Sequence, residues 1–555
     1  MPRADMPVPA TTKKQNGLLR GMLDGLRGAK ARLRGSRPVI DENTRRYIEF
    51  NRRKWPRDFP IDKDAVILVG LFDYRPSIHC YSYLTNYLAR RTHSAIETFA
   101  FAQKISSVTE ATYASFGARR GLTYADAERF RAEAASQADA IFAGLKDKWD
   151  VLKITVDGVL LGDLIYDTYL RRDLKATIDL RSESHRAWIT DAIAILRACR
   201  EYFAHRQVRA IICDHTVYIQ SGILVRLASL MNIPVYMLQF RSDFFVIRLD
   251  PELPEGNQSN ARRWPYYKYR QLFAELTQEE QEAARAKARA NLDARLAGKI
   301  DDNVLKGISA YTGTGDKIFH DSGEKPRVVI LLHDFCDSVH KYRDMLFVDY
   351  YDWVHYLFAQ AGQTGFAWYA KPHPNNLLGD EKVIINNAVI GELKKEFPHI
   401  TFLDPAVSNR QMVDEGIRAV FTVHGTGGHE FAYMGTPVVN AGDNLHITYD
   451  FNLHPKSLEE YGRCIANAGS LELKIDKLQV EEFFYMHHYY FPERLAAKVH
   501  PIESTFLKAP DFQTRAMRSE AYLPFIQGAT PERDKDVLAY FNQYFATQPG
   551  LVFKS

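Results

Sequence analysis

The stretch that decides the fold spans residues 418–450 and reads RAVFTVHGTGGHEFAYMGTPVVNAGDNLHITYD. β-branched and aromatic residues at 420–423 predict a strand, the run HGTGG at 424–428 predicts a tight turn, and residues 430–434 predict a helix that ends at Gly435. A second strand is predicted at 437–440. This succession of strand, glycine-rich turn, helix and strand is typical of a doubly wound α/β sheet.

The turn suggests an anion site. Unpaired N–H groups at a helix start favour negative charge by about 0.3–1 kcal/mol, and by up to about 2 kcal/mol when partly buried. The glycines allow a phosphate to approach the backbone, Thr426 adds a hydroxyl, and Glu430 is expected one turn into the helix on the same rim. Such turns also occur for packing alone, and both interpretations stay open.

A second polar corner lies upstream. Residues 366–370 (FAWYA) predict a strand, which is followed by KPHPNN at 371–376. A histidine between two prolines either contacts a ligand or only fixes the corner. We therefore treat His373 as a candidate and keep the structural alternative.

Composition limits the class of protein. A chain of 555 residues predicts two or three domains, and a net charge of +4 provides no basic field for nucleic acid. Five cysteines without metal spacing indicate reduced thiols and a cytoplasmic setting. No apolar run approaches the roughly 20 residues of a membrane span, and no secretory signal is expected at the N-terminus.

The chain is predicted to contain four parts. Residues 1–60 form a basic extension, in which residues 13–37 predict an amphipathic helix that either lies on an anionic membrane surface or packs on the protein. Residues 61–318 and 319–470 are expected to be two Rossmann-like domains. Residues 471–555 are expected to be helices that pack across both domains.

Strands and helices alternate in both domains, which predicts parallel sheets covered on both faces. In the first domain strands are expected at 65–71, 95–100, 152–156, 210–213 and 234–238, and in the second at 328–332, 366–371 and 400–403 as well as 420–423 and 437–440. Ligands bind beyond the carboxyl ends of such strands. The candidate residues at these ends are Asp73, Asp214, His215, His333, Asp334 and Asp337.

These motifs together resemble the bacterial capsule and surface-polysaccharide biosynthesis proteins, especially those grouped with the Kdo transferases of capsule synthesis. The similarity covers roughly residues 65–455. It implies a GT-B fold of two facing Rossmann-like domains and glycosyltransferase activity in the cytoplasm or at the inner membrane. It is carried by KPHP at 371–374, by the run from His424 through Glu430 to PVV at 437–439 and Gly442, by DLIYD at 163–167, and by Asp214-His215 followed by Tyr218 and GIL at 222–224.

The resemblance also implies functional residues. His373 would contact phosphate or ribose, and Glu430 the ribose hydroxyls. Separately, the position of His333, Asp334 and Asp337 at the end of the second domain's first strand predicts that they line the cleft between the domains. Many relatives carry serine or a small residue where this chain has His424 and His429, so the base and the sugar stay open. The donor-binding residues would be Lys371, His373, Asn375, His424, Thr426, Gly427, Gly428 and Glu430.

Glycosyl transfer breaks a sugar–phosphate bond through an oxocarbenium-like state, so the departing phosphate needs cationic or N–H-rich surroundings. Asp-x-Asp occurs at Asp62 and Asp64 and again at Asp534 and Asp536, but neither pair follows a buried strand of the second domain. We therefore expect neither a metal nor a cofactor. The acceptor hydroxyl needs a general base, for which Asp73, Asp214 and His215 are the candidates.

Three alternatives remain from the sequence. One is a CDP-glycerol or CDP-ribitol phosphotransferase of the teichoic-acid kind, and another is a nucleotide-sugar 2-epimerase. The third is a non-catalytic protein of polysaccharide assembly or export. The expected partners are a nucleotide sugar and a polysaccharide or glycolipid acceptor.

Overall fold

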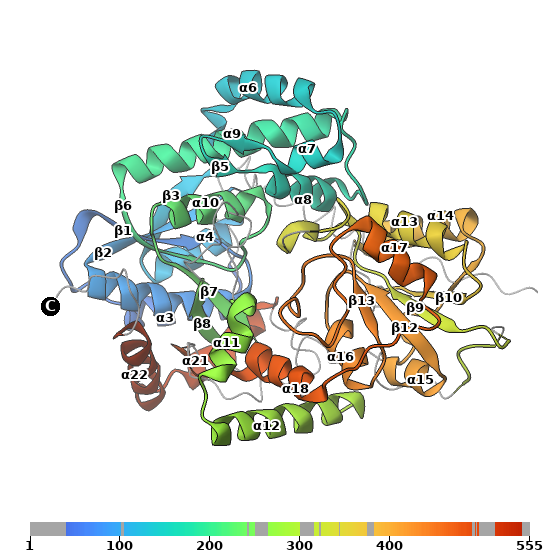
Figure 1. Cartoon of the computed structure of the whole chain (residues 1–555). Helices are drawn as coiled ribbons and strands as arrows, with labels where there is room; N and C mark the ends of the chain where they lie inside the picture. The colour runs from blue at the N-terminus through green and yellow to red at the C-terminus, as the bar shows by residue number, and fades with distance from the viewer. Residues whose placement is uncertain are drawn as a thin grey trace, which may run out of the picture.

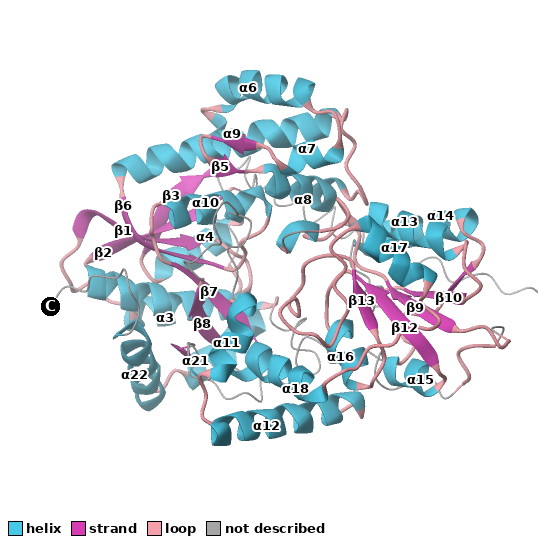
Figure 2. Cartoon of the chain, in the orientation of Figure 1, coloured by secondary structure: helices cyan, strands magenta, loops and turns pink. Residues whose placement is uncertain are grey.

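The computed structural model describes residues 40–101, 105–240, 244–249, 265–299, 316–320, 323–342, 345–373, 382–490, 494, 497–498 and 517–546. The basic segment 13–37 and Asn375 lie outside these residues, so the predictions for them stay predictions. The predicted α/β class is confirmed: two halves each carry a sheet flanked by helices (Figures 1 and 2). The first half comprises described residues up to 249, and the second comprises those from 316 to 466.

The sheet of the first half has the order β14-β8-β7-β6-β1-β2-β3 among the described residues. Strands β7 to β3 in this order run parallel, whereas β8 and β14 form an antiparallel edge. The sequence predicted a wholly parallel sheet, but the connection from β7 to β8 is too short for the crossover that parallel strands require. The strands are β1 (Asp62–Gly70), β2 (Ser94–Ala100), β3 (Ala118–Thr123), β6 (Gln207–Cys213), β7 (Val235–Phe240), β8 (Phe244–Arg248) and β14 (Ala497–Lys498).

Helices cover both faces of this sheet. Val66 and Leu68 of β1 enter one hydrophobic cluster, and Ile67 and Val69 enter another on the opposite face. Successive residues of a strand point to opposite faces, so a continuous apolar strand is buried on both sides. The helices are α2 (Glu42–Lys54), α3 (Arg75–Thr92), α4 (Ser107–Ser115), α5 (Tyr124–Glu128), α6 (Arg131–Gly144), α7 (Lys148–Leu152), α8 (Gly162–Asp173), α9 (Glu183–His205) and α10 (Tyr218–Leu230).

The strand predicted at 152–156 is wrong. Residues before it form α7, and β4 (Thr155–Val156) pairs only with β5 (Val159–Leu160) in a separate hairpin. Asp157 and Gly158 both have positive φ, +49° and +76°. Two such residues form the tight turn that closes an antiparallel hairpin, so this strand cannot join the parallel sheet.

The second half has a five-stranded parallel sheet in the order β11-β10-β9-β12-β13 within the described residues. Its central strand β9 places Val328 and Ile330 in one cluster and Val329 in another, so this sheet is also doubly covered. The elements are β9 (Arg327–Leu331), η4 (Val339–Lys341), α13 (Tyr350–Ala361), β10 (Ala367–Lys371), α14 (Lys382–Glu396), β11 (Ile400–Phe402), α15 (Asn409–Asp414), β12 (Ile417–Thr422), α16 (Gly427–Tyr433), β13 (Val438–Asn440) and α17 (Leu458–Ala466).

The remaining helices lie between the halves or against the first half. In Figure 1 α12 and α18 lie side by side along the junction of the two sheets, and α18 also contacts α16. α12, placed within residues 61–318 by the sequence, therefore packs against the second half. Further along the chain, α21 packs on α2, and α22 on β14. These helices are η2 (Tyr266–Lys268), α11 (Tyr269–Ala274), α12 (Gln278–Leu296), α18 (Lys477–Tyr485), the π-helix η6 (Met486–Tyr490), η7 (Ser519–Ala521), α21 (Tyr522–Gly528) and α22 (Pro531–Ala546).

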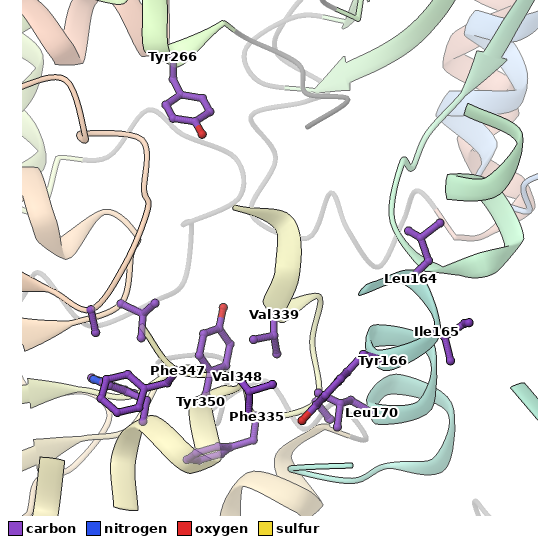
Figure 3. Close-up of a cluster of buried hydrophobic side chains, with 14 of the residues drawn as sticks. Leu164, Ile165, Tyr166, Leu170, Tyr266, Phe335, Val339, Phe347, Val348 and Tyr350 are labelled. Carbon is purple, nitrogen blue, oxygen red and sulfur yellow. The ribbon is translucent and has the colours of Figure 1, made fainter. Parts of the chain in front are cut away.

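The halves also share a buried contact through α8. Figure 3 shows Leu164, Tyr166 and Leu170 of α8 in one hydrophobic cluster with Phe335 and Val339 of the second half. We call this contact the α8 joint. Its polar members are Asp167, which accepts a hydrogen bond from His340 Nδ1 at 2.7 Å, and Tyr166, whose hydroxyl donates to Asp349 Oδ2 at 2.6 Å.

Candidate active site

The carboxyl edge of the second sheet is where its strand order reverses. β9 and β12 are neighbours there, and in doubly wound folds ligands bind at this point. His333, just after β9, accepts a hydrogen bond at Nε2 from the Val423 N–H at 3.2 Å. Its ring centroid lies 4.7 Å from that of His424. The loop after β9 and the glycine-rich turn after β12 are therefore in direct contact.

His333 is a neutral group in this contact. Since Nε2 accepts from Val423, the ring proton of neutral His333 lies on Nδ1. Burial lowers the pKa of His333 well below its usual value. Tyr350 stacks on this ring at 4.6 Å, and its hydroxyl forms a hydrogen bond with His424 Nε2. His424 is thus buried among aromatic rings, and its contact with a donor stays a prediction.

The glycines of the turn serve packing to a large extent. A Cβ on Gly427 would lie 2.4 Å from Leu331 Cδ1, and one on Gly428 would lie 2.4 Å from His446 Cε1. Gly425 instead has open space around it and a φ of +110°, which favours glycine. Thr426 is exposed. The helix that follows it, α16, has only seven residues, so the helix dipole adds little to anion binding here.

Substitution of Gly428 by alanine is expected to lower the free energy of unfolding by about 1–3 kcal/mol, because the buried His446 ring must shift. Chemical denaturation measures the change. Gly391→Ala in α14 is the control, since nothing lies within 4 Å of its added Cβ. That variant is expected to be neutral or stabilised by up to about 1 kcal/mol. Equal behaviour of the two variants would exclude the packing role.

Glu430 lies inside the second half, not on its rim. Its side chain is fully buried, and it accepts hydrogen bonds from Arg295 Nε at 3.0 Å and from Asn409 Nδ2 at 3.0 Å. Lys371 joins the same network by donating from Nζ to Asn409 Oδ1 at 2.8 Å. Burial lowers the pKa of Lys371 to about 8. The structure thus places both side chains behind the edge where the sequence expected them to meet a donor.

His373 belongs to a charged cluster at the ends of β9 and β10. Its Nδ1 lies 3.9 Å from Asp334 Oδ1, and Lys382 Nζ lies 3.5 Å from Asp334 Oδ2. Lys382 also donates to Asp337 Oδ2 at 3.1 Å, and Asn386 Nδ2 donates to Asp334 Oδ1 at 2.8 Å. We call these residues the rim cluster. The side chains of His373 and Asp337 are 38% and 42% exposed, which leaves both accessible to a ligand.

The electrostatics of the rim cluster are mixed. Burial raises the pKa of Asp337, but Lys382, the Ser338 N–H and Lys341 lower it more, to about 2. Burial lowers the pKa of His373, a shift that solvent moderates because the ring is partly exposed. At neutral pH the cluster therefore combines the ionised carboxylate of Asp337 with a lysine and the neutral imidazole of His373. Such a mixture suits hydroxyl groups as well as phosphate.

The sequence predicted that His373 and the glycine-rich turn act together on one phosphate. His373 follows β10 and the glycine-rich turn follows β12, and β9 lies between these strands in the sheet. The loop after β9 therefore separates His373 from the turn. His373 contacts this loop through Asp334, and His424 contacts it through His333. A ligand held by both must cross the loop after β9.

The edge of the first sheet presents the three candidate bases. Asp214, after β6, accepts hydrogen bonds from the hydroxyls of Ser77, at 3.1 Å, and Tyr81. Asp73, after β1, pairs with Arg75 and accepts from Thr109 Oγ1 at 2.9 Å. β1 and β6 are neighbours at the reversal of strand order in this sheet. The structure thus brings both carboxylates to the edge that the sequence predicted.

His215 differs from these carboxylates. It is exposed, and within the described part of the chain its imidazole forms no hydrogen bond. Its ring meets that of Phe72 edge to face at 5.7 Å. Among the three candidates it is therefore the least constrained.

Sequence reasoning missed two residues of this arrangement. Lys382 is the first residue of α14, where a positive charge opposes the helix dipole, and this unfavourable position was an available signal. Tyr218 was noted only as part of a motif, yet its hydroxyl donates to Asp337 Oδ1 at 2.9 Å. It thereby connects the edge of the first sheet to the rim cluster. No sequence pattern indicates such a contact between halves.

The described residues contain neither a candidate metal centre nor a membrane-spanning helix. No three His, Cys, Asp or Glu side chains in the described ranges are grouped so that they could hold a metal ion. Among the same residues, no helix has the length and apolar character needed to cross a membrane.

The sequence matches no protein-family model and no curated protein. Similar solved structures include KpsC of Thermosulfurimonas dismutans, a beta Kdo 2,4 transferase, with a TM-score of 0.31 and 13% identity over 51% of this chain and 85% of that one. A UDP-GlcNAc 2-epimerase from Neisseria meningitidis bound to UDP-GlcNAc has a TM-score of 0.22 and 10% identity, over 75% of this chain and 97% of that one. A mutant O-GlcNAc transferase of Thermobaculum terrenum has a TM-score of 0.22 and 10% identity, over 89% of this chain and 76% of that one. Likeness at this level carries no argument about function.

Proposed function

We propose that this protein is a glycosyltransferase of bacterial capsule or surface-polysaccharide synthesis. It would transfer a sugar from a nucleotide-sugar donor, with CMP-Kdo as the first to test, to a glycan or glycolipid acceptor. The contact between Tyr218 and Asp337 supports this proposal most, because it joins the strand-end loops of the two sheets beside His373. In the proposal the donor lies on the second half and the acceptor on the first.

The rim cluster suits the donor chemically. Breaking a sugar–phosphate bond leaves negative charge on the departing phosphate, which hydrogen-bond donors and cations stabilise. His373 and Lys382 are such groups, and the exposed hydroxyl of Thr426 lies on the other side of the loop after β9. Asp337, ionised and partly exposed, is suited to accept a hydrogen bond from a ribose or sugar hydroxyl.

His215 is the preferred general base of this proposal. Asp214 accepts two hydroxyl hydrogen bonds and Asp73 is paired with Arg75, so oxygens of both carboxylates are already engaged by neighbouring side chains. The exposed imidazole of His215 carries no such contact from a described residue. Histidine is the side chain that most often acts as a general base in enzymes.

Replacement of His373 by alanine is expected to reduce kcat/KM about 10- to 150-fold, the loss of one hydrogen bond to a charged group. The assay measures CMP release together with the mass gained by the acceptor. His320→Ala is the control, because His320 is an exposed histidine of the same half. Turnover near that of the wild type in a folded His373→Ala protein would contradict the role of His373.

The same assay separates the alternative enzymes. A CDP-polyol phosphotransferase would release CMP from CDP-glycerol or CDP-ribitol and add a phospho-polyol mass to the acceptor. A nucleotide-sugar 2-epimerase would change a UDP-sugar without any acceptor. A protein that binds none of CMP, CDP and UDP by calorimetry would instead be a non-catalytic assembly or export component.

A further inference from the structure

Tyr218 holds a strained backbone conformation. Its φ is +63°, a region that non-glycine residues with bulky side chains rarely adopt. The other non-glycine residues with positive φ in the described part of the chain close an element: His93 and Leu174 cap helix ends, Asp157 turns a hairpin, and Asn232 follows α10. Tyr218 instead begins a helix. Strain of this kind persists only where the surroundings hold it, and it clusters at functional sites.

The first half anchors the backbone around Tyr218. The N–H of Ile219 donates to Thr168 Oγ1 of α8 at 3.0 Å. At Gly222, one turn into α10, a Cβ would lie 2.5 Å from Leu164 Cδ2, so α10 and α8 are in close contact. The start of α10 is thus fixed on the helix that forms the α8 joint.

The side chain of Tyr218 reaches the other half. Its hydroxyl donates to Asp337 Oδ1 at 2.9 Å, while Lys382 donates to the second oxygen of that carboxylate at 3.1 Å. Burial raises the pKa of Tyr218, so the hydroxyl stays protonated and acts as a donor. The residues immediately before Tyr218 are those of the loop at 214–217, which carries Asp214 and His215.

We infer that Tyr218 is a positioning residue for the proposed transfer, setting the loop at 214–217 against the rim cluster. This inference rests on the proposed function. The anchored backbone and the bridging hydroxyl together determine where the general base stands relative to the donor. Tyr218 acts through Asp337 and the loop, and it does not touch the reacting atoms.

The test compares Tyr218→Phe with wild type in donor binding and turnover. The variant keeps the ring and the backbone conformation and loses only the hydroxyl. The expected result is a kcat at least about tenfold lower, as for the loss of a hydrogen bond to a charged group, with clearly smaller changes in the Kd for CMP by calorimetry, in the donor KM and in the melting temperature. Tyr356→Phe is the control, since that hydroxyl donates only to the Leu458 carbonyl within the second half.

A second variant separates the effect of the strained backbone at Tyr218 from that of the hydrogen bond between its hydroxyl and Asp337. Asparagine tolerates positive φ, so Tyr218→Asn is expected to remain folded and to lose kcat as Tyr218→Phe does. An unchanged kcat in Tyr218→Phe, with wild type active, would overturn the positioning role alone. A joint fall of melting temperature, CMP affinity and kcat would overturn it in favour of a structural role. Absence of nucleotide binding and turnover in the wild type would overturn the proposed function, and this inference with it.

Discussion

Replacing Asp167 by alanine is expected to lower the free energy of unfolding by about 3–5 kcal/mol, because a buried charge loses its partner. Asp167 accepts hydrogen bonds from His340 Nδ1 at 2.7 Å and from the Val339 N–H at 3.1 Å. The other ring nitrogen of His340 lies 2.7 Å from the Val348 carbonyl oxygen, to which it donates. Both ring nitrogens of His340 face acceptors, so each carries a proton. The His340–Asp167 pair therefore holds one proton more than a neutral histidine beside an ionised carboxylate would. Chemical denaturation measures the loss.

The pH dependence of this effect follows from His340. Burial lowers the pKa of His340, but the charge and hydrogen bond of Asp167, with Asp163 and the Val348 carbonyl, raise it above its usual value overall. The folded protein therefore binds this proton more tightly than the unfolded chain. The resulting stability is complete below about pH 6.5 and is lost as the pH rises through the folded pKa. The difference between wild type and Asp167→Ala should accordingly be larger at pH 6 than at pH 9.

The matched control is Lys148→Ala, at the same junction of the halves. Lys148 Nζ lies 2.6 Å from Asp352 Oδ1, with side chains 25% and 36% exposed. It also lies 3.9 Å from the buried Asp349, which keeps its hydrogen bonds from Tyr166 and Thr177 when the lysine is removed. An ion pair with this exposure contributes at most about 1 kcal/mol. If Asp167→Ala were no more harmful than Lys148→Ala, the α8 joint would not hold the halves together through this pair.

Arg295→Met is expected to lower the free energy of unfolding by a similar amount, about 3–5 kcal/mol, because it leaves Glu430 buried beside an apolar group. Arg295 Nε donates to Glu430 Oε1 at 3.0 Å, and the two side chains are only 8% and 0% exposed. The contact ties α12 to α16 although the residues are 135 positions apart. Denaturant titration of the full chain gives the change in stability.

Two further variants make this result specific. Arg494 pairs with Glu280 of the same helix at 2.9 Å, and the two side chains are 40% and 47% exposed, so Arg494→Met is expected to lose at most about 1 kcal/mol. The double variant Arg295→Met with Glu430→Gln should recover most of the loss, because a neutral side chain is less costly to bury than a charged one. Failure of the double variant to recover would show that Arg295 acts mainly through packing.

Local patterns were sufficient for most elements near the site. The apolar run at 420–423 and the glycines after it predicted β12, α16 and β13, because hydrophobic periodicity and turn residues act over short distances. The strand predicted at 152–156 failed, since the conformation of Asp157 and Gly158 directs the chain into a hairpin. The antiparallel β8 was missed, because pairing direction depends on the neighbouring strand as well as on composition.

The sequence by itself determined the α/β class and the placement of polar residues at the ends of buried strands, because burial of an apolar run leaves its polar successors at the sheet edge. The tertiary structure alone decided which of these stay exposed at the sheet edge. The side chains of Glu430 and Lys371 point inward, and neighbouring side chains occupy the space beside Gly427 and Gly428. Lys382 and Tyr218 both contact Asp337 of the rim cluster. The reason is physical: periodicity reports which face of an element is buried, whereas the partner of a side chain comes from distant sequence and is selected by packing.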